Sequence, residues 1–386
     1  MLRRVGPHFI QTPGPSNVPG RVLEALARPT IDHRSQDFSR LALELQSGLR
    51  RVFRTEHPVI VYPSSGTGAW EAALVNCLSP GDRVLAFETG HFATLWRDLA
   101  ERHGLVVDMV PGDWRHGVDP SVVEEVLTRD ADHMIRAVTV VHNETSTGVT
   151  SPVEEVRAAM DRAGHPALLL VDTISSLGSM EFEHDAWRVD VAVGCSQKGL
   201  MLPPGLGFNA LSPRAIEAAE RSRLSRSYWD WRPILEANGD GFYPYTLPTN
   251  LLVALGVSLE MLEDEGLPRV FERHRRHAAA TRAAVEAWEL ELWCAEPDGY
   301  SSALTAVRVP DGFDGARVTE VVLESSNIAL GAGLGRLAGR VFRIGHLGYL
   351  NDAWLCGVIG GVAAGLRRAG IAVPRSGVDE ALAAMQ

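Results

Sequence analysis

Residues 168–173 read LLLVDT, and residues 189–198 read VDVAVGCSQK. Both stretches are short apolar runs that end on polar side chains, a pattern typical of buried strands in a parallel sheet. Asp172 follows the first run, and Lys198 follows the second. In open α/β sheets, ligands bind where the carboxyl ends of the parallel strands meet. We therefore expect Asp172 and Lys198 to share that edge of one sheet.

The same alternation of apolar runs and helix-like segments continues over residues 58–210 and predicts an α/β fold with a mostly parallel, seven-stranded sheet. From residue 268 onward the sequence pattern predicts an α+β arrangement, with strands expected at Ala303–Val309 and Val341–Ile344. We predict a large domain of residues 16–265 and a small domain of residues 1–15 and 266–386. The strands of the large sheet are expected at Pro58–Tyr62, Arg83–Phe87, Val106–Val110, Ala137–His142, Ala167–Val171, Val189–Gly194 and Gly207–Ala210.

The composition is that of a globular protein, with 45% hydrophobic residues and a formal net charge of -11. This charge disfavours nucleic acid and anionic membranes as partners, because both attract basic surfaces. No apolar run is long enough to span a bilayer and no signal peptide is evident, so we expect a cytoplasmic protein. The cysteines form no C-x-x-C pair, so we predict neither a metal site nor a disulfide framework. They are Cys77, Cys195, Cys294 and Cys356.

Lys198 is the only lysine among 37 lysines and arginines. Arginine can replace lysine wherever only a solvated positive charge is needed, but a guanidinium cannot lose its proton or condense with a carbonyl. A desolvated lysine amine can do both. Lys198 is therefore the candidate for chemistry, and Asp172 is its candidate partner. A purely structural ion pair between the two is the competing interpretation.

A glycine- and hydroxyl-rich turn follows the first predicted strand. Residues 63–68 read PSSGTG and precede the helical sequence AWEAAL. This turn can cradle a phosphate with backbone N–H groups at a helix N-terminus, although such turns often only cap a helix. The turn lacks the features of a nucleotide P-loop or a dinucleotide fingerprint. A phosphate site, a carboxylate and an imine-forming lysine together match pyridoxal 5′-phosphate.

Two further segments can complete such a site. Residues 90–94 read GHFAT, in which Phe92 is favoured over His91 as the aromatic ring that stacks on the pyridine. Residues 142–148 read HNETSTG and offer hydroxyl groups to the phenolic oxygen of the cofactor. Each segment by itself is more often core packing or turn chemistry.

These motifs, in this order, resemble class V pyridoxal-phosphate aminotransferases of the alanine/serine–glyoxylate type. The resemblance covers about residues 10–370 and rests on TPGPSN at 12–17, HNETSTG, VDT at 171–173, SQKG at 196–199 and FRIGHLG at 342–348. Within the family the likeness is greatest to the bacterial serine–glyoxylate enzymes, through SGTGAWE, ETGHF and GAGL. It implies a fold type I transferase that forms a homodimer, with each active site completed by the partner chain.

The resemblance also implies roles for individual residues. Lys198 is expected to be the Schiff-base lysine, Asp172 the partner of the pyridine nitrogen, and Phe92 the stacking ring. Arg343 is expected to bind the substrate carboxylate, which suits the fork of a guanidinium. The other implied cofactor contacts are Ser65, Gly66, Thr67 and Gln197 at the phosphate, Thr145 at the phenolic oxygen, Ile174 beneath the ring, and Tyr243 and Thr246 reaching the phosphate from the partner chain.

The implied reaction moves the amino group of a small L-amino acid to glyoxylate, giving glycine and a 2-oxo acid. Serine is the favoured donor and would yield hydroxypyruvate, with Lys198 moving the proton from the substrate Cα. Alanine and aspartate stay open as donors because each presents the same α-carboxylate to Arg343. Arg336 could accept a second carboxylate, which would favour aspartate.

Three other functions compete with this interpretation. A lyase or cysteine desulfurase on the same fold is possible, but a desulfurase needs a mobile nucleophilic cysteine, and no cysteine here lies in such a setting. A regulator that only binds the cofactor usually carries an added DNA-binding module. We expect no such module here, because the predicted fold takes up the chain and its net charge is acidic. A nucleotide site at residues 331–335 lacks the strand-turn-helix context.

Overall fold

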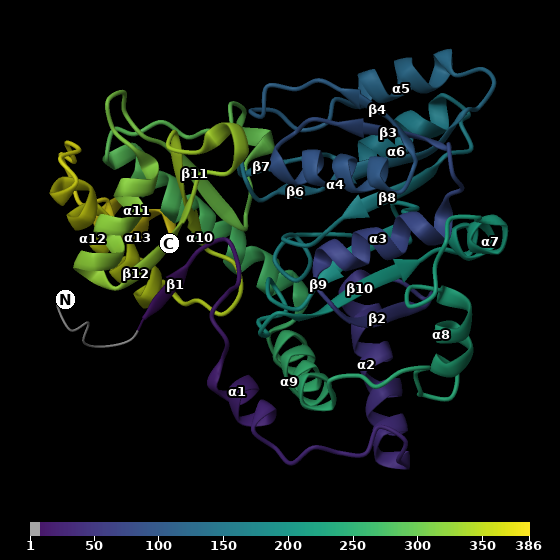
Figure 1. The fold of residues 1–386 in the computed structure, drawn as a ribbon. Helices are drawn as coiled ribbons and strands as arrows, with labels where there is room; N and C mark the ends of the chain where they lie inside the picture. Colours follow the sequence, from purple (N-terminus) through teal and green to yellow (C-terminus); the bar gives the residue numbers. More distant parts are fainter. Residues whose placement is uncertain (1–7) are drawn as a thin grey trace.

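The computed structural model describes residues 8–386 and contains the seven-stranded sheet that the sequence predicts (Figure 1). Its strands lie in the order β2-β10-β9-β8-β5-β3-β4. β10 runs antiparallel to both neighbours, and the other neighbouring pairs are parallel. The strands are β2 (Val59–Ser64), β3 (Arg83–Phe87), β4 (Val106–Val110), β5 (Ile135–Val141), β8 (Leu168–Asp172), β9 (Val191–Cys195) and β10 (Gly205–Leu211).

Both faces of this sheet are buried under helices. Along β8, Leu169 and Val171 pack into one apolar cluster, whereas Leu168 and Leu170 pack into another. This alternation is the period of two that a strand imposes on its side chains. The first face is covered by α2 (Gln36–Phe53), α5 (Pro120–Arg129), α6 (Val153–Arg162) and α9 (Thr249–Glu265), and the second by α3 (Gly66–Cys77), α4 (His91–Arg102), α7 (Pro213–Arg221) and α8 (Trp231–Asn238).

A second sheet of four strands has the order β1-β12-β13-β11. The strands predicted at Ala303–Val309 and Val341–Ile344 are β11 (Leu304–Arg308) and β13 (Val341–Gly345). The sheet also contains β1 (Phe9–Gln11), which pairs parallel to β12 (Ile328–Ala332). The helices of this C-terminal region are α10 (Leu267–Ala287), α11 (Gly315–Ser326), α12 (Asp352–Arg368) and α13 (Val378–Ala384).

The N-terminal strand thus joins the C-terminal sheet, as Figure 1 shows. The domain boundaries of 16–265 against 1–15 and 266–386 stay a prediction, and residues 1–7 of them lie outside the described residues. The short elements of the chain are α1 (Gly20–Leu26), β6 (Asn143–Glu144), β7 (Val149–Thr150), η1 (Pro297–Gly299) and η2 (Gly335–Leu337).

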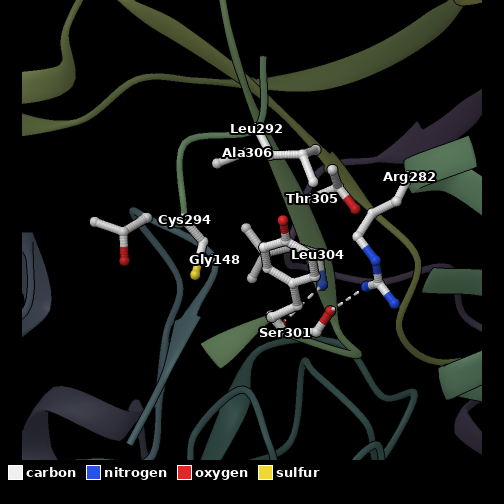
Figure 2. Close-up of a pocket in the computed structure, with 10 residues that line it drawn as sticks. Gly148, Arg282, Leu292, Cys294, Ser301, Leu304, Thr305 and Ala306 are labelled. Carbon is white, nitrogen blue, oxygen red and sulfur yellow. Dashed lines mark hydrogen bonds between the residues drawn. The ribbon is translucent and has the colours of Figure 1, made fainter. Parts of the chain in front are cut away.

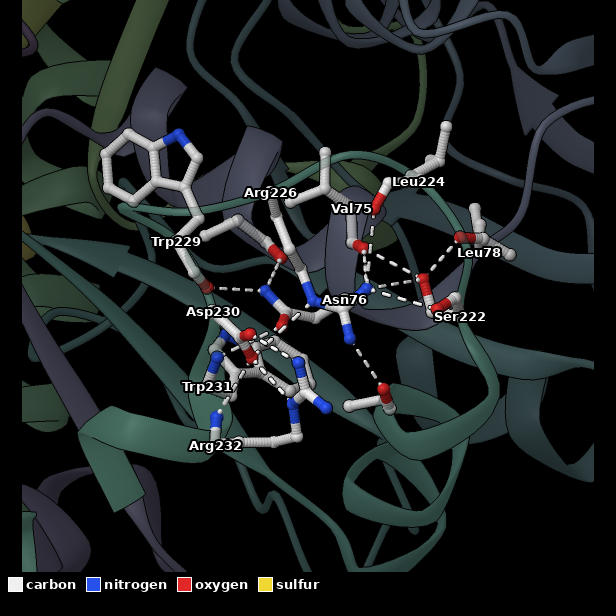
Figure 3. Close-up of polar contacts among 12 residues, drawn as sticks. Val75, Asn76, Leu78, Ser222, Leu224, Arg226, Trp229, Asp230, Trp231 and Arg232 are labelled. Atoms are coloured by element: carbon white, nitrogen blue, oxygen red, sulfur yellow. Dashed lines mark hydrogen bonds and ion pairs between the residues drawn. The ribbon is translucent and has the colours of Figure 1, made fainter. Parts of the chain in front are cut away.

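The segment that links α7 to α8 is tied to the end of α3 by polar contacts (Figure 3). Asn76 bridges the two, because its amide donates to Trp229 O (2.7 Å) and its carbonyl accepts from Trp231 N (3.1 Å). Arg226 donates to Val75 O at the end of α3 (3.1 Å). These bonds hold the Trp229 ring against Gly68, near the start of α3.

Among residues 8–386, no helix is both long enough and apolar enough to cross a membrane.

Candidate active site

Asp172 and Lys198 lie at the same edge of the large sheet, as the sequence predicts. Asp172 is the last residue of β8, and Lys198 follows the end of β9, the neighbouring strand, by three residues. Both side chains are buried, with 4% and 9% of their surface exposed. The Lys198 amine donates to Pro13 O at 2.5 Å, and the two side chains form no ion pair among the described residues. The contacts therefore do not support the structural ion pair as the reason for their proximity.

The ionisation of both groups is shifted by burial. The Asp172 pKa is raised to about 7, mainly by burial; the Glu144 carboxylate acts in the same direction, whereas Ile174 N, Trp70 and Lys198 oppose it. Burial also lowers the Lys198 pKa, and the positive charge of Arg343 acts in the same direction. Desolvation disfavours the charged form of each group. The site therefore holds a lysine amine that gives up its proton more readily than a surface lysine.

The Asp172 carboxylate keeps most of its hydrogen-bonding capacity free. It accepts one hydrogen bond, from Ile174 N to Oδ1 at 2.6 Å. The indole N–H of Trp70 is buried without a hydrogen-bond partner among residues 8–386, yet it is close enough to lower the Asp172 pKa. An ionised carboxylate can accept about four hydrogen bonds. Asp172 can therefore accept a further charged donor.

The turn at Ser65–Thr67 packs beside this carboxylate. A Cβ on Gly66 would collide with the Ile174 side chain, whose own N–H binds Asp172. Gly66 is the first residue of α3, and the Ser65 side chain makes no capping hydrogen bond, so the first N–H groups of the helix lack a side-chain partner. Ser65 and Thr67 are exposed. These N–H groups and the helix dipole suit a phosphate.

The Phe92 ring and the Thr145 hydroxyl come from α4 and from the loop after β6. Phe92 is half-buried, and its ring meets Trp70 edge-on, with ring centroids 6.5 Å apart. Thr145 Oγ1 donates to Ser175 Oγ at 2.7 Å. Phe92 is linked to the Thr145 loop through Glu144, which accepts from Phe92 N.

Arg343 on β13 reaches this site from the four-stranded sheet. Its side chain is buried, and its three nitrogens donate to Ala332 O (3.0 and 2.8 Å) and to Thr145 O (2.7 Å). No carboxylate forms an ion pair with it among the described residues, and burial lowers its pKa to about 10. A buried guanidinium without an anion is costly, so the arrangement favours an anionic ligand.

The other predicted contacts are more scattered. Gln197 is half-buried beside Lys198, and its backbone O accepts from Ser16 N at 3.0 Å. Tyr243 packs edge-on against Phe38, with centroids 6.3 Å apart. Thr246 is exposed, with its hydroxyl 3.4 Å from the His33 ring. The contact of Tyr243 and Thr246 with a partner's phosphate site stays a prediction.

Sequence reasoning overlooked two residues of this site. Trp70 stands in the quoted sequence SGTGAWE, but nothing in the pattern indicates that its N–H points toward Asp172. Glu144 stands in HNETSTG, yet the hydroxyls around it attracted the functional interpretation. The structure buries Glu144 completely, within hydrogen-bonding distance of the first turn of α4.

Arg336 is already paired with a carboxylate, and none of the four cysteines lies in an activating setting. Arg336 forms an ion pair with Glu88 (2.5 Å) and stacks on Trp114, 5.2 Å from the ring centroid, so its charge is already matched. Burial raises the pKa of all four cysteines, Cys195 to about 12, so none of them is an activated thiolate. No group of three or more metal-ligating side chains occurs in the described part of the chain.

A separate small cavity lies between β11 and the loop before it (Figure 2). Figure 2 shows Arg282 and Ser301 on one side of the cavity and Cys294 on the other; the Arg282 guanidinium donates to Ser301 O at 3.3 Å. None of the predicted site residues lines this cavity. It is therefore distinct from the site at the strand ends.

The residues at the strand ends fit pyridoxal 5′-phosphate. Lys198 provides an amine for an aldehyde, Asp172 a carboxylate with free lone pairs for a pyridinium, and the start of α3 a set of N–H groups for a phosphate. The indole N–H of Trp70, which has no hydrogen-bond partner among residues 8–386 and lowers the Asp172 pKa, is a further donor near Asp172.

Comparison with known proteins decides the family. The sequence profile of the family Aminotransferase class-V matches residues 9–339. The chain belongs to the class-V aminotransferases. It is therefore a pyridoxal-phosphate-dependent aminotransferase of fold type I.

Several class-V aminotransferases of known name are similar along almost the whole chain. An L-aspartate–glyoxylate aminotransferase of Paracoccus denitrificans is 49% identical over 90% of this chain and 87% of its own length. A serine–glyoxylate aminotransferase of Methylorubrum extorquens is 46% identical over 98% and 96%. The crystal structure of an alanine–glyoxylate aminotransferase from Nostoc sp. superposes with a TM-score of 0.88 at 35% identity, covering 95% of this chain and 97% of that one.

Proposed function

We propose that this class-V aminotransferase moves the amino group of a small L-amino acid, serine first, to glyoxylate, producing glycine and hydroxypyruvate. The observation that carries the proposal is the buried Arg343 guanidinium, which forms no ion pair with a carboxylate of residues 8–386 and whose charge lowers the Lys198 pKa. Both substrates present one carboxylate beside the reacting carbon, and a single anchoring arginine suits both. Relatives named for serine and glyoxylate support the choice of substrates.

The residues of the chain divide the work as follows. Pyridoxal phosphate, when bound, supplies an electrophilic carbon and a ring that delocalises negative charge from the substrate Cα. Arg343 holds the substrate carboxylate through two N–H groups, which fixes the Cα beside the Lys198 amine. Lys198, with its lowered pKa, accepts and returns the Cα proton. Asp172 keeps a proton on the pyridine nitrogen by supplying a negative charge beside it.

The phosphate end and the ring face are assigned to the remaining predicted residues. Ser65, Gly66, Thr67 and Gln197 would hold the phosphate, with Phe92 on one face of the ring and Ile174 on the other. Thr145 would contact the phenolic oxygen. The close packing of Gly66 on Ile174 and the lack of a side-chain cap on the first N–H groups of α3 support this assignment.

Aspartate is the second candidate donor, because the Paracoccus relative is named for it. Arg336 is the residue that could accept a second carboxylate. Its guanidinium is already paired with Glu88, whose side chain is only 10% exposed. An aspartate side chain would have to displace that carboxylate and leave Glu88 without its partner. We therefore place serine ahead of aspartate, with alanine as the third candidate.

A donor and acceptor panel tests the substrates. Purified holoenzyme is supplied with serine, alanine or aspartate, each against glyoxylate, pyruvate and 2-oxoglutarate, and the amino acid products are quantified. The proposal expects the highest kcat/KM for serine with glyoxylate. If no donor converts glyoxylate to glycine, the proposal is wrong; if aspartate exceeds serine, the donor assignment is wrong.

Borohydride reduction tests the role of Lys198. The reduced holoenzyme is digested, and the peptides are analysed by mass spectrometry. A pyridoxyl group is expected on the peptide that contains Lys198. A pyridoxyl group on any other peptide, or on none, would contradict the assignment.

We also propose a cytoplasmic homodimer in which Tyr243 and Thr246 contact the phosphate site of the partner chain. The exposure of both Thr246 and the Ser65–Thr67 turn is compatible with such a contact. Light scattering coupled to gel filtration should give twice the chain mass. Mixed dimers of Lys198→Ala and Tyr243→Phe chains should regain activity above either parent, because one intact site forms per dimer. Failure to regain activity would contradict shared sites.

A further inference from the structure

The Glu144 carboxylate is the most deeply buried acidic group near the active site. Its side chain has no exposed surface, and it forms no ion pair with any cation among the described residues. Burying an ionised carboxylate without a cation is unfavourable unless hydrogen bonds replace its water. The surrounding contacts show what replaces that water.

Four donors surround this carboxylate. Oε1 accepts from Phe92 N (3.3 Å), Ser146 N (3.0 Å) and Ser146 Oγ (2.6 Å), and Oε2 accepts from Ala93 N (3.1 Å). His91 N donates to the same Ser146 hydroxyl at 2.9 Å. A Cβ on Gly90 would collide with the Glu144 side chain, so Gly90 leaves the space that the carboxylate fills.

These contacts place a negative charge at the N-terminus of α4. Gly90 precedes the helix and makes no side-chain capping hydrogen bond, and the first turn contains no acidic residue. Glu144 and Ser146 therefore supply, from another part of the chain, the cap that the helix sequence lacks. An acid at this position also interacts favourably with the helix dipole.

The same carboxylate also acts on two groups of the active site. It raises the pKa of Asp172 and that of Arg343, so its charge is felt at both. Thr145, the next residue along the chain, offers the carbonyl that accepts from Arg343 (2.7 Å). Hydrogen bonds thus link Glu144 to the helix turn that carries Phe92, whereas Asp172 and Arg343 are affected only through its charge.

We propose that Glu144 is a positioning residue that fixes the Phe92 ring against the cofactor. It touches neither substrate nor cofactor and acts through α4 and the Thr145 loop. The part concerning Phe92 rests on the proposed function, in which Phe92 stacks on the cofactor ring. The capping of α4 by Glu144 does not depend on that function.

The test compares Glu144→Gln with Glu101→Gln. Glu101 is exposed on the same helix, so it provides a control with the same chemical change. A glutamine at 144 has no charge and turns its NH₂ toward N–H donors. In the cofactor-free protein, hydrogen exchange of the Phe92 and Ala93 amides should rise about tenfold, the size expected for the loss of a hydrogen bond to a charged group. Glu101→Gln should leave both amides unchanged.

The loaded enzyme gives the second set of readouts. Glu144→Gln should weaken the binding of pyridoxal phosphate, followed by tryptophan fluorescence, about tenfold. It should also reduce the visible circular dichroism of the bound cofactor. Its kcat should fall while the KM for the amino donor stays within about threefold, because Arg343 keeps its bonds to Ala332 O and Thr145 O.

Each outcome supports or overturns the proposal. Unchanged amide exchange in Glu144→Gln, or equal changes in Glu101→Gln, would overturn it. Faster amide exchange with unaltered cofactor affinity and dichroism would keep the helix cap but overturn the proposal that Glu144 positions the Phe92 ring, while leaving the stacking of that ring in the proposed function untouched. If Glu144→Gln does not fold, Ser146→Ala replaces it, because it keeps the carboxylate and removes one of its donors. A smaller increase in exchange at His91, Phe92 and Ala93 is then expected, and no increase would overturn the proposal.

Discussion

Two buried carboxylates, Asp172 at the end of β8 and Glu144 in β6, lie in regions of the same site that use the negative charge differently. Asp172 accepts one hydrogen bond and is 4% exposed, whereas Glu144 accepts four and is fully buried. The first therefore retains lone pairs for a ligand, and the second has its oxygens occupied by the protein. Burial alone does not mark a binding residue; the number of donors already present does.

The largest expected effect tests the open carboxylate. Asp172→Asn removes the charge that a protonated pyridine nitrogen requires, so kcat/KM should fall by about 1,000-fold, the scale seen when one preorganised electrostatic contact is removed. Steady-state kinetics with serine and glyoxylate measure it. Glu144→Gln is expected to cost less than Asp172→Asn. The comparison of the two carboxylates is wrong if the kcat/KM of Asp172→Asn stays within about tenfold of the natural enzyme, or if Glu144→Gln lowers kcat/KM more than Asp172→Asn does.

The second effect tests the Arg343 guanidinium, which donates to Thr145 O directly after Glu144. Arg343→Lys keeps the charge but loses the planar fork, so the KM for the amino donor should rise about 30- to 100-fold. Arg336→Lys is the matched control, because Arg336 is largely exposed and paired with Glu88. Exposed ion pairs contribute little, so the serine KM should stay within about threefold. If the substitution at Arg336 raises the KM more than the one at Arg343, the substrate carboxylate binds Arg336 rather than Arg343.

The third effect tests the ionisation of Asp172 in the cofactor-free protein. Burial raises its pKa from an ordinary value near 3.8 to about 7, so the folded protein holds a proton that the unfolded chain releases between those pH values. The stability that Asp172 contributes is therefore complete below about pH 4 and is lost as the pH rises to about 7. The change amounts to a few kcal/mol, on the order of 1.4 kcal/mol for each pH unit.

Urea unfolding of the cofactor-free protein at pH 5 and pH 7.5 measures this change. Asp172→Asn should show a smaller loss of unfolding free energy between the two pH values than the natural sequence. An equal loss in both proteins would assign the pH dependence to other groups.

The smallest effect concerns Thr145, which follows Glu144 and precedes Ser146. Thr145→Val removes the hydroxyl that donates to Ser175 Oγ but keeps the carbonyl that accepts from Arg343. The free energy of unfolding should fall by about 1 kcal/mol, the net value of one hydrogen bond. Equilibrium urea unfolding at pH 7.5 measures it, with Thr145→Ser as the variant that restores the hydroxyl. A loss above about 3 kcal/mol would show that Thr145 also supports the Glu144 region.

The amino-acid sequence by itself determined the large sheet and the residues at the ends of its strands. Short apolar runs and polar residues directly after them are local signals, and all seven predicted strands of that sheet are present. The same signals found Asp172, Lys198 and the turn at Ser65–Thr67, since each follows a strand. The single lysine in an arginine-rich chain pointed to the residue before any contact was known.

Only the tertiary structure decided which hydrogen-bond partners surround the buried charged groups of the site. Arg343 is one of many arginines, and its guanidinium is held by Ala332 O on the neighbouring strand β12 and by Thr145 O, which lies 198 positions earlier in the chain. Glu144 is the last residue of β6 and precedes three hydroxyl residues, and its four donors come partly from α4, about 50 positions earlier. Strand ends are determined locally, whereas the satisfaction of a buried charge depends on groups that folding brings together from remote segments.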